Sequence, residues 1–294
     1  MDFVRKPSVA GQFYDADKEN LLKTIEECFQ DDRGPGSIPK ISNKEENLIG
    51  VIAPHAGYIF SGSIAAHSFN KIADNGFADT FIILGPNHTG MGSPISSMTK
   101  GSWMTPFGNV PIDKNIANKI TKEIIVDDNN AHMSEHSIEV QIPFLQYISD
   151  EKEFSFVPIN MGMQDIKTSK EIGDIIYDSI IDSDKKIMII ASSDFSHMGF
   201  NYMTMPPEGI RIDEYTKNQD DKAIEKILKL DSEGLIKTVE DENITMCGYG
   251  PVAVLITVAK KLGCKKAELL KYGTSYEVHP GSSCVGYGAI SIQK

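Results

Sequence analysis

Three apolar runs, rich in β-branched residues, constrain most strongly what this 294-residue chain can fold into. They are LIGVIAP (48–54), TFIILGPNH (80–88) and KKIMIIASSDFSH (185–197). Continuous rather than alternating apolar character is typical of strands that are buried on both faces of a sheet. Segments with helical periodicity separate these runs, and such an alternation of strands and helices predicts a layered α/β domain.

The rest of the chain continues the alternation. The predicted helices cover 17–30, 61–76, 116–124, 136–148, 169–181, 220–230, 232–240 and 251–263, and further strands cover 154–161 and lie near 266–272 and 285–292. Residues 31–47 are punctuated by glycine and proline and are predicted to form a surface loop. Because no long linker or internal repeat interrupts the pattern, we expect a single domain that spans residues 1–294.

The charge balance argues against two classes of partner. The sequence holds 41 acidic and 29 basic residues, which gives a formal net charge of -12. Nucleic acids and anionic membranes are polyanions that need Lys and Arg to replace their counterions. We therefore expect neither to be a partner of this protein.

Nothing in the sequence indicates secretion or a membrane span. The N-terminal stretch MDFVRKPSVAGQFY lacks the apolar core of a signal peptide, and no window approaches the roughly 20 apolar residues that cross a bilayer. A cytoplasmic location is the expectation. The cysteines show no C-x-x-C spacing, which argues against a disulfide framework or a structural zinc site; they are Cys28, Cys247, Cys264 and Cys284.

Histidines follow the predicted buried strands. His55 and His88 come directly after the first two strands, and Asp194 and His197 follow the third. Ligands of open α/β sheets bind beyond the carboxyl ends of the strands, so these side chains are expected to share one pocket. Each histidine could instead pack locally, and SSDFSH could cap a helix, although capping would leave His197 unexplained.

Two histidines with a third, anionic ligand are suited to a divalent metal ion. A carboxylate as third ligand suits Fe(II), whereas a thiolate also admits zinc or copper. The sequence leaves the third ligand open between Asp194, Glu135, Glu139 and Cys247. Tyr58, Asn87 and Tyr249 are further candidates for the walls of the pocket.

Cys247, in TMCGYGP, precedes the predicted helix 251–263, which has a proline in its first turn. The positive end of the helix dipole favours a thiolate, the form that binds a metal or attacks a substrate. A small residue chosen for close packing beside glycines is the alternative.

The stretch EHSIEVQIPFL (135–145) places Glu135, His136, Glu139 and Gln141 close together. On a helix, His136 and Glu139 would share one face at a spacing of i, i+3, which can supply two metal ligands or an acid–base pair. The alternative is an ordinary helix start with Ser134 as its cap and with surface charges.

Together these motifs make the chain resemble the Memo family. The resemblance rests on PHAGYIFSG, ILGPNHTG, EHSIEVQIPFL, SSDFSHMG, MCGYGP and VGYGAI, in this order, and it covers almost the whole chain. Memo proteins are similar in fold to the LigB-type class III extradiol dioxygenases, which use non-haem iron. The resemblance implies a single three-layer α/β/α domain with a central mixed sheet.

The resemblance also implies roles for individual residues. His55 and His88 match the two histidine ligands of the dioxygenase iron, and His197 matches a histidine that acts there as an acid or base. Cys247 stands where the dioxygenases have a glutamate ligand. A thiolate in place of a carboxylate changes the softness of the site and its charge donation to the metal, so ring-cleaving activity does not follow from the fold.

Three functions are compatible with these features. The first is a protein with Fe(II), or else copper or zinc, on His55, His88 and Cys247, doing redox or oxygen chemistry on an unknown small molecule or peptide, with Asp194, His197 and His136 as candidate catalytic groups. The second is a metal-dependent hydrolase with His197 or Glu135 as general base. The third is a binding module that holds a peptide or a phosphorylated ligand without turnover.

Overall fold

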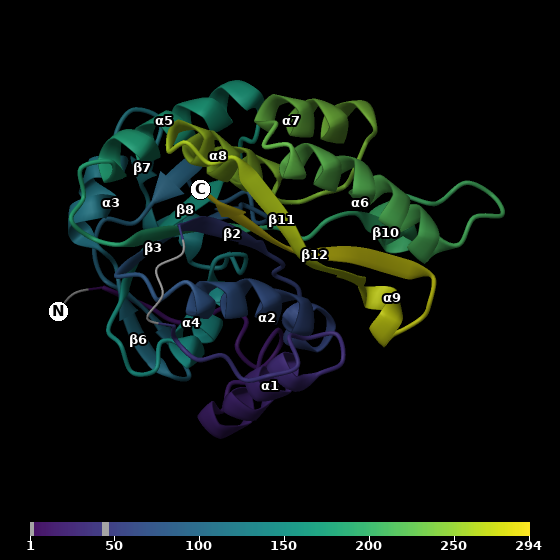
Figure 1. Cartoon of the computed structure of the whole chain (residues 1–294), viewed down its shortest axis with the longest axis horizontal. Coiled ribbons are helices and arrows are strands. Elements are labelled where there is room, and N and C mark those ends of the chain that lie inside the picture. Colours follow the sequence, from purple (N-terminus) through teal and green to yellow (C-terminus); the bar gives the residue numbers. More distant parts are fainter. Residues whose placement is uncertain (1–2, 43–46) are drawn as a thin grey trace.

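The computed structural model describes residues 3–42 and 47–294. Its main feature is a nine-stranded mixed sheet (Figure 1). Along the sheet, the order is β10 (His197–Gly199), β12 (Ser283–Gln293), β2 (Leu48–Ala53), β9 (Ile187–Ser192), β3 (Thr80–Pro86), β8 (Ser155–Met161), β4 (Ile95–Ser97) and β7 (Val126–Asp127), with β11 (Lys266–Thr274) paired to β12.

The four central strands, β2, β9, β3 and β8, are parallel, whereas β12 and β4 pair with them in the antiparallel sense. Every residue of β3 is buried, because helices cover both faces of the sheet. The predicted mixed sheet within a three-layer α/β/α domain is therefore confirmed.

Helices form the two outer layers (Figure 1). One layer contains α1 (Lys18–Gln30), α2 (Tyr58–Asp74) and α4 (Ile142–Ile148). The other contains α3 (Lys114–Ile120), α5 (Ile166–Ile180), α6 (Ile212–Leu228), α7 (Ser232–Asp241) and α8 (Tyr249–Lys261). Among the described residues, no helix is long and apolar enough to cross a membrane.

The sequence did not predict a second, three-stranded sheet, in the order β1 (Val4–Arg5), β5 (Ser102–Thr105) and β6 (Gly108–Pro111). These strands have two to four residues and carry too few side chains to show a period. The remaining short elements are η1 (Asn129–His132), η2 (Glu139–Gln141), η3 (Phe200–Tyr202) and α9 (Ser275–Val278).

The predicted helix 136–148 is wrong over residues 136–141, nearly half of its length. The α-helix begins only at Ile142, with Pro143 in its first turn, and residues 139–141 form a 3-10 turn. The cause lies in the side chain of Glu135, whose Oε1 accepts hydrogen bonds from the backbone N–H groups of His136 and Ser137, both at 2.9 Å. These side-chain bonds compete with helix formation.

A buried ion pair fastens the N-terminal segment to the same stretch. The Arg5 Nη1 donates to Glu139 Oε2 at 2.5 Å, and both side chains are almost fully buried. The Glu139 carboxylate also accepts the backbone N–H groups of Ser8 and Val9 and the hydroxyl of Tyr14. The Glu139 carboxylate is therefore engaged by the N-terminal segment.

A second buried carboxyl supports the turn that leads into β10. The Asp220 Oδ1 accepts the N–H of Ser196 at 2.8 Å, and its Oδ2 accepts the hydroxyl of Tyr272 at 2.7 Å. Burial raises the pKa of Asp220 to about 7, although the hydrogen bonds from Ser196 and Tyr272 oppose this rise.

Replacing this carboxyl by an amide should therefore change how stability depends on pH. The folded pKa of Asp220 lies above the unfolded value of about 3.9, so the folded state holds the extra proton and loses stability as pH rises from about 4 to 7. As pH rises across this window, the free energy of unfolding of Asp220→Asn should increase relative to that of the parent by up to about 4 kcal/mol, at about 1.4 kcal/mol per pKa unit. Urea unfolding at both ends of the window measures the gain.

The exposed neighbour provides the control for this experiment. Asp221 pairs with Lys217 on the surface of α6, so Asp221→Asn should show little pH-dependent gain. A stability difference between Asp220→Asn and the parent that is the same at both pH values would contradict the prediction.

Candidate metal centre

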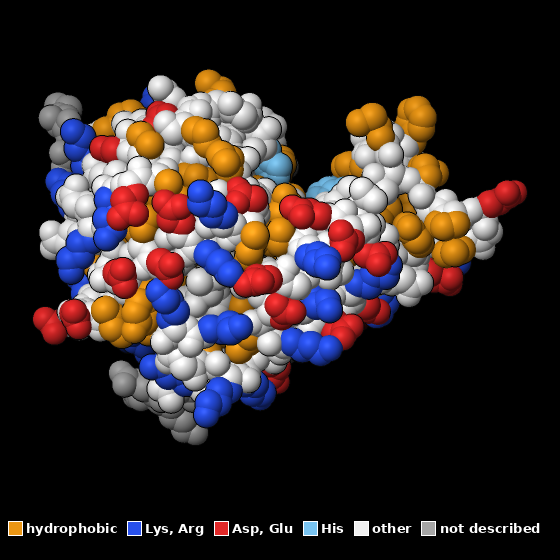
Figure 2. All heavy atoms as spheres, turned by 90° about the horizontal axis from the view of Figure 1, so that it is seen from above, with side chains coloured by type: hydrophobic (Ala, Val, Ile, Leu, Met, Phe, Trp, Pro, Cys, Tyr) orange, Lys and Arg blue, Asp and Glu red, His pale blue; other side chains and the backbone are white. Residues whose placement is uncertain are grey.

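The sequence-predicted site residues meet at the carboxyl ends of β2, β3 and β9. His55, His88, Asp194, His136 and His197 all line one cavity of about 470 Å³. In the space-filling view, histidine side chains lie in the hollow between the main body and a projecting lobe (Figure 2). The prediction that these strand ends share a pocket is therefore confirmed.

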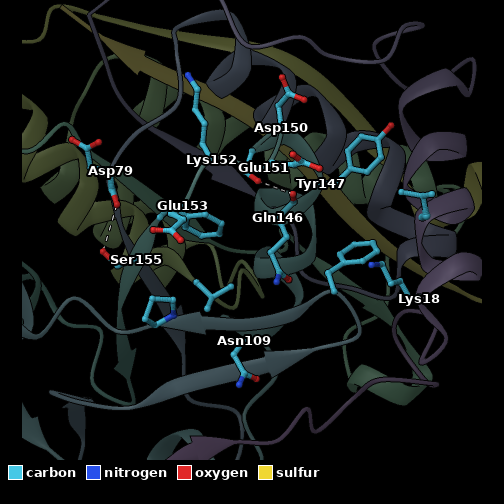
Figure 3. A pocket seen from close by; sticks show the side chains of 16 residues that line it. Lys18, Asp79, Asn109, Gln146, Tyr147, Asp150, Glu151, Lys152, Glu153 and Ser155 are labelled. Atoms are coloured by element: carbon cyan, nitrogen blue, oxygen red, sulfur yellow. Dashed lines mark hydrogen bonds between the residues drawn. The ribbon is translucent and has the colours of Figure 1, made fainter. Parts of the chain in front are cut away.

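A second cavity, of about 890 Å³, lies at the opposite, amino end of the strands, where Asp79 precedes β3 and Ser155 begins β8 (Figure 3). Its lining includes Lys18, Tyr147 and Glu151 but no histidine or cysteine. Although it is larger, it lacks the soft donors that a transition metal prefers.

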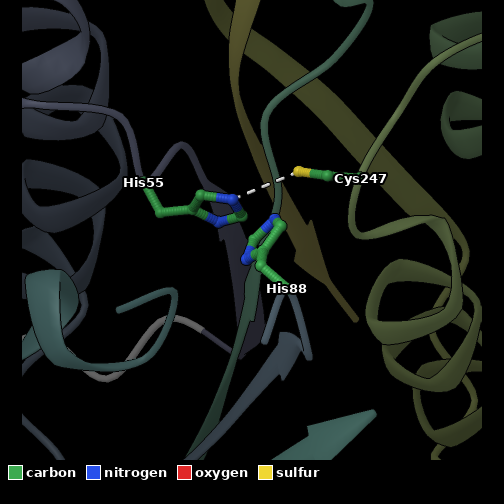
Figure 4. A group of neighbouring side chains, drawn as sticks. All are labelled: His55, His88 and Cys247. Atoms are coloured by element: carbon green, nitrogen blue, oxygen red, sulfur yellow. Dashed lines mark hydrogen bonds between the residues drawn. The ribbon is translucent and has the colours of Figure 1, made fainter. Parts of the chain in front are cut away.

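Three donors converge at the histidine-lined cavity: the side chains of His55, His88 and Cys247 (Figure 4). Their ligand atoms all lie within 4.8 Å of one another. The His55 and His88 rings are 5.2 Å apart at an angle of 76°, so the planes that contain their lone pairs cross rather than run parallel. In this arrangement, the nitrogen lone pairs of both rings can point to one position between them.

The spacing of these donors fits a bound metal ion. The distance from His55 Nε2 to Cys247 Sγ is 3.1 Å. A metal about 2.1 Å from nitrogen and about 2.3 Å from sulfur, with a right angle between the two bonds, would separate the donors by about 3.1 Å. The separation of these two donors is therefore compatible with both of them holding one metal ion.

A buried carboxylate orients the second histidine. Glu135 Oε1 lies 3.0 Å from His88 Nδ1, and its Oε2 accepts the His88 backbone N–H at 2.6 Å. A carboxylate only accepts, so Nδ1 carries the proton and Nε2 is free for a metal. Burial acts to raise the pKa of Glu135, but His88, the Ser137 N–H and His136 lower it to about 2. Glu135 therefore orients the His88 ring.

The thiol of Cys247 does not follow the helix-dipole expectation. It lies just before Gly248, the N-cap of α8, yet burial and the charge of Asp194 raise the pKa of Cys247 well above its ordinary value. The backbone N–H of Asp194 donates to its sulfur at 3.2 Å. A bound metal would reverse this balance, because a coordinating thiol is deprotonated.

Asp194 and His197 support the site from the end of β9. The Asp194 Oδ1 accepts the backbone N–H of His55 at 2.7 Å, and burial raises the pKa of this carboxyl, with His197 opposing the rise. The His197 Nδ1 lies 3.0 Å from the carbonyl oxygen of Thr245. Since a carbonyl only accepts, the His197 Nε2 keeps a free lone pair.

His136 reaches the cavity, although not from a helix face shared with Glu139. Its ring stacks on His88, with centroids 4.7 Å apart and an angle of 22°, and it packs against Phe13. His88, Glu135 and His136 form a second group of possible metal ligands. Nearly parallel rings do not direct their lone pairs to one point, so the first group is the better metal site.

Several residues near the candidate site were not singled out from the sequence: Ser192 lies 2.9 Å from His55 Nδ1, and Phe13, Tyr202 and Tyr287 line the cavity. Gln141, which the sequence placed near Glu135 and His136, donates to Ser192. The polar end of the run 185–197 was a signal for Ser192, whereas nothing in the N-terminal segment marked Phe13. The suggested wall residues Tyr58, Asn87 and Tyr249 do not line this cavity.

Comparisons with known proteins agree with the fold and the motifs. A family model described as "Memo-like protein" matches residues 5–291. A MEMO1 family protein of Methanopyrus kandleri is 45% identical over 293 residues, covering 99% of each chain. A MEMO1 family protein of Saccharolobus solfataricus is 45% identical over 290 residues, covering 96% of this chain and 97% of the relative.

A solved structure shares the fold at low sequence identity. It is an uncharacterized protein of Escherichia coli K12, with a TM-score of 0.52 and 12% identity, and the match covers 83% of this chain and 99% of that one. At this identity the likeness supports the architecture alone.

Proposed function

The chain belongs to the Memo-like protein family, and we propose that it binds one Fe(II) ion through His55, His88 and Cys247. The observation that carries the proposal is the convergence of these three side chains from remote parts of the chain, with donor atoms within 4.8 Å of one another. Two imidazoles and a thiolate are donors that iron accepts, and copper and zinc are the competing metals.

The cavity beside the three donors supports a redox or oxygen reaction on a small molecule. Iron with open coordination positions would supply a redox-active centre that can bind oxygen or a substrate donor atom. The free Nε2 of His197 is placed to accept or donate a proton, and Asp194 holds the backbone of His55. His136 and Phe13 form part of the wall on the side of His88.

Metal loading tests this proposal directly. Protein purified without oxygen and loaded with Fe(II) should hold about one equivalent of iron, and oxygen uptake in the presence of a reductant should depend on that iron. Competition with Zn(II) and Cu(I) ranks the three metals. Absence of tight Fe(II) binding would overturn the proposal, and retained zinc with a hydrolytic turnover would point to a metal-dependent hydrolase instead.

A further inference from the structure

The environment of His55 differs from that of His88, because its second ring nitrogen faces a serine hydroxyl and not a carboxylate. His55 Nδ1 lies 2.9 Å from the Oγ of Ser192, the last residue of β9. This hydroxyl has two other neighbours, the carbonyl oxygen of Ser137 at 2.6 Å and the Nε2 of Gln141 at 2.8 Å. All four residues are almost fully buried.

The chemistry of these neighbours determines which atom donates. The Ser137 carbonyl can only accept, so the hydroxyl proton of Ser192 points to it. The Gln141 amide group donates to Ser192, and the same nitrogen donates to the Pro54 carbonyl at 2.9 Å, which fixes the orientation of the amide. The second lone pair of the Ser192 oxygen can then only accept a hydrogen bond. Its one remaining neighbour is His55 Nδ1, which must therefore carry a proton and donate it.

We propose that Gln141 and Ser192 are positioning residues that hold the His55 proton on Nδ1 and so present Nε2 to the metal. In the other tautomer, the bare Nδ1 would face a serine lone pair, or the hydroxyl would turn and leave the Ser137 carbonyl unpaired. Either outcome would leave a buried polar group unpaired, and avoiding that cost selects one tautomer.

The consequence for the fold is that one short segment, residues 135–141, orients both histidines. Glu135 accepts from His88 directly, and Gln141 acts on His55 through Ser192. The segment is itself fixed to the end of β3, because the Ser137 hydroxyl donates to the Pro86 carbonyl at 2.9 Å. Gly85 permits this approach, since a Cβ there would lie 2.4 Å from Ser137 Oγ.

This inference rests on the proposed iron site, and its first test does not need the metal. Nitrogen-15 NMR of the labelled, metal-free protein above pH 8 reports the tautomer of each of the seven histidines, and a His55→Asn variant assigns the His55 signals. In the parent we expect the His55 proton on Nδ1. In Ser192→Ala we expect a mixture of tautomers.

The second readout is the affinity for Fe(II), measured without oxygen against a competing chelator. Ser192→Ala and Gln141→Met should weaken binding by about 10- to 100-fold, as loss of an outer-shell partner does in other metal sites. Ser192→Thr keeps the hydroxyl and should restore most of the affinity. Ser291→Ala is the matched control, because Ser291 is buried in β12 and its hydroxyl has no partner among the described residues.

Two results would overturn the inference: a His55 proton on Nε2 in the parent, or a Ser192→Ala variant that keeps both the parent tautomer and the parent affinity. Failure of the proposed function looks different. In that case the parent binds no Fe(II), whereas the NMR measurement still decides whether Ser192 controls the tautomer.

Discussion

Alanine in place of His88 or Cys247 should abolish stoichiometric binding of Fe(II). Each substitution removes one of three converging donors and leaves two; His136 and His197 also line the cavity, but neither belongs to this group of donors. The loss of affinity should exceed the roughly 10- to 100-fold that follows loss of an outer-shell partner. Iron content after anaerobic loading and gel filtration measures the effect.

A buried cysteine outside the site provides the matched control. Cys264 precedes β11 and is buried, so Cys264→Ala should keep about one equivalent of iron. The three-ligand site would be refuted if Cys247→Ala and Cys264→Ala retained the same amount of iron as the parent. If His88→Ala lost iron but Cys247→Ala kept it, the parent site would use the two histidines with a third ligand other than Cys247.

Arg5→Ala should destabilise the protein by about 3–5 kcal/mol, because it leaves the Glu139 carboxylate buried without its ion-pair partner. The Arg5 side chain also donates to the carbonyl oxygens of His132 and Glu135 and lies 4.1 Å from the centre of the Trp103 ring. Urea unfolding of the metal-free protein, followed by circular dichroism, measures the change in the free energy of unfolding.

An exposed arginine tests whether burial is the cause. Arg211 pairs with Asp213 at 2.7 Å, yet its side chain is 62% exposed. Arg211→Ala should therefore cost far less stability than Arg5→Ala, because exposed ion pairs contribute little. Equal losses of stability in the two variants would show that burial of the Arg5–Glu139 pair is not what stabilises the N-terminal segment.

The sequence predicted those residues of the candidate site that directly follow a buried strand. Continuous apolar runs identified β2, β3 and β9, and parallel strands bring their carboxyl ends to one edge of a sheet. His55 and His88 follow such ends directly, so their meeting could be expected. Periodicity also identified the long helices, although α2 begins three residues and α6 eight residues earlier than predicted.

The proposed third ligand could not be chosen from the residues alone, since Cys247 lies 192 positions from His55 along the chain. Four candidates competed, and only tertiary packing separates them. Glu139 is engaged by Arg5, Glu135 orients His88, and Asp194 accepts the His55 N–H. The sequence also could not predict that residues 136–141 are not α-helical, because this depends on the Glu135 side chain accepting the backbone N–H groups of His136 and Ser137.

The order of the three donors along the chain sets when the centre can first exist. His88 and Cys247 are 247 − 88 = 159 positions apart. At a synthesis rate of roughly 5–20 residues per second, the ribosome needs roughly 8–32 seconds to add the thiol after the second histidine. During that interval the nascent chain carries both imidazole donors of the proposed site, His55 and His88, but not the thiol of Cys247. A metal ion held by all three donors would therefore be acquired late, after β2, β3 and β9 have been synthesised.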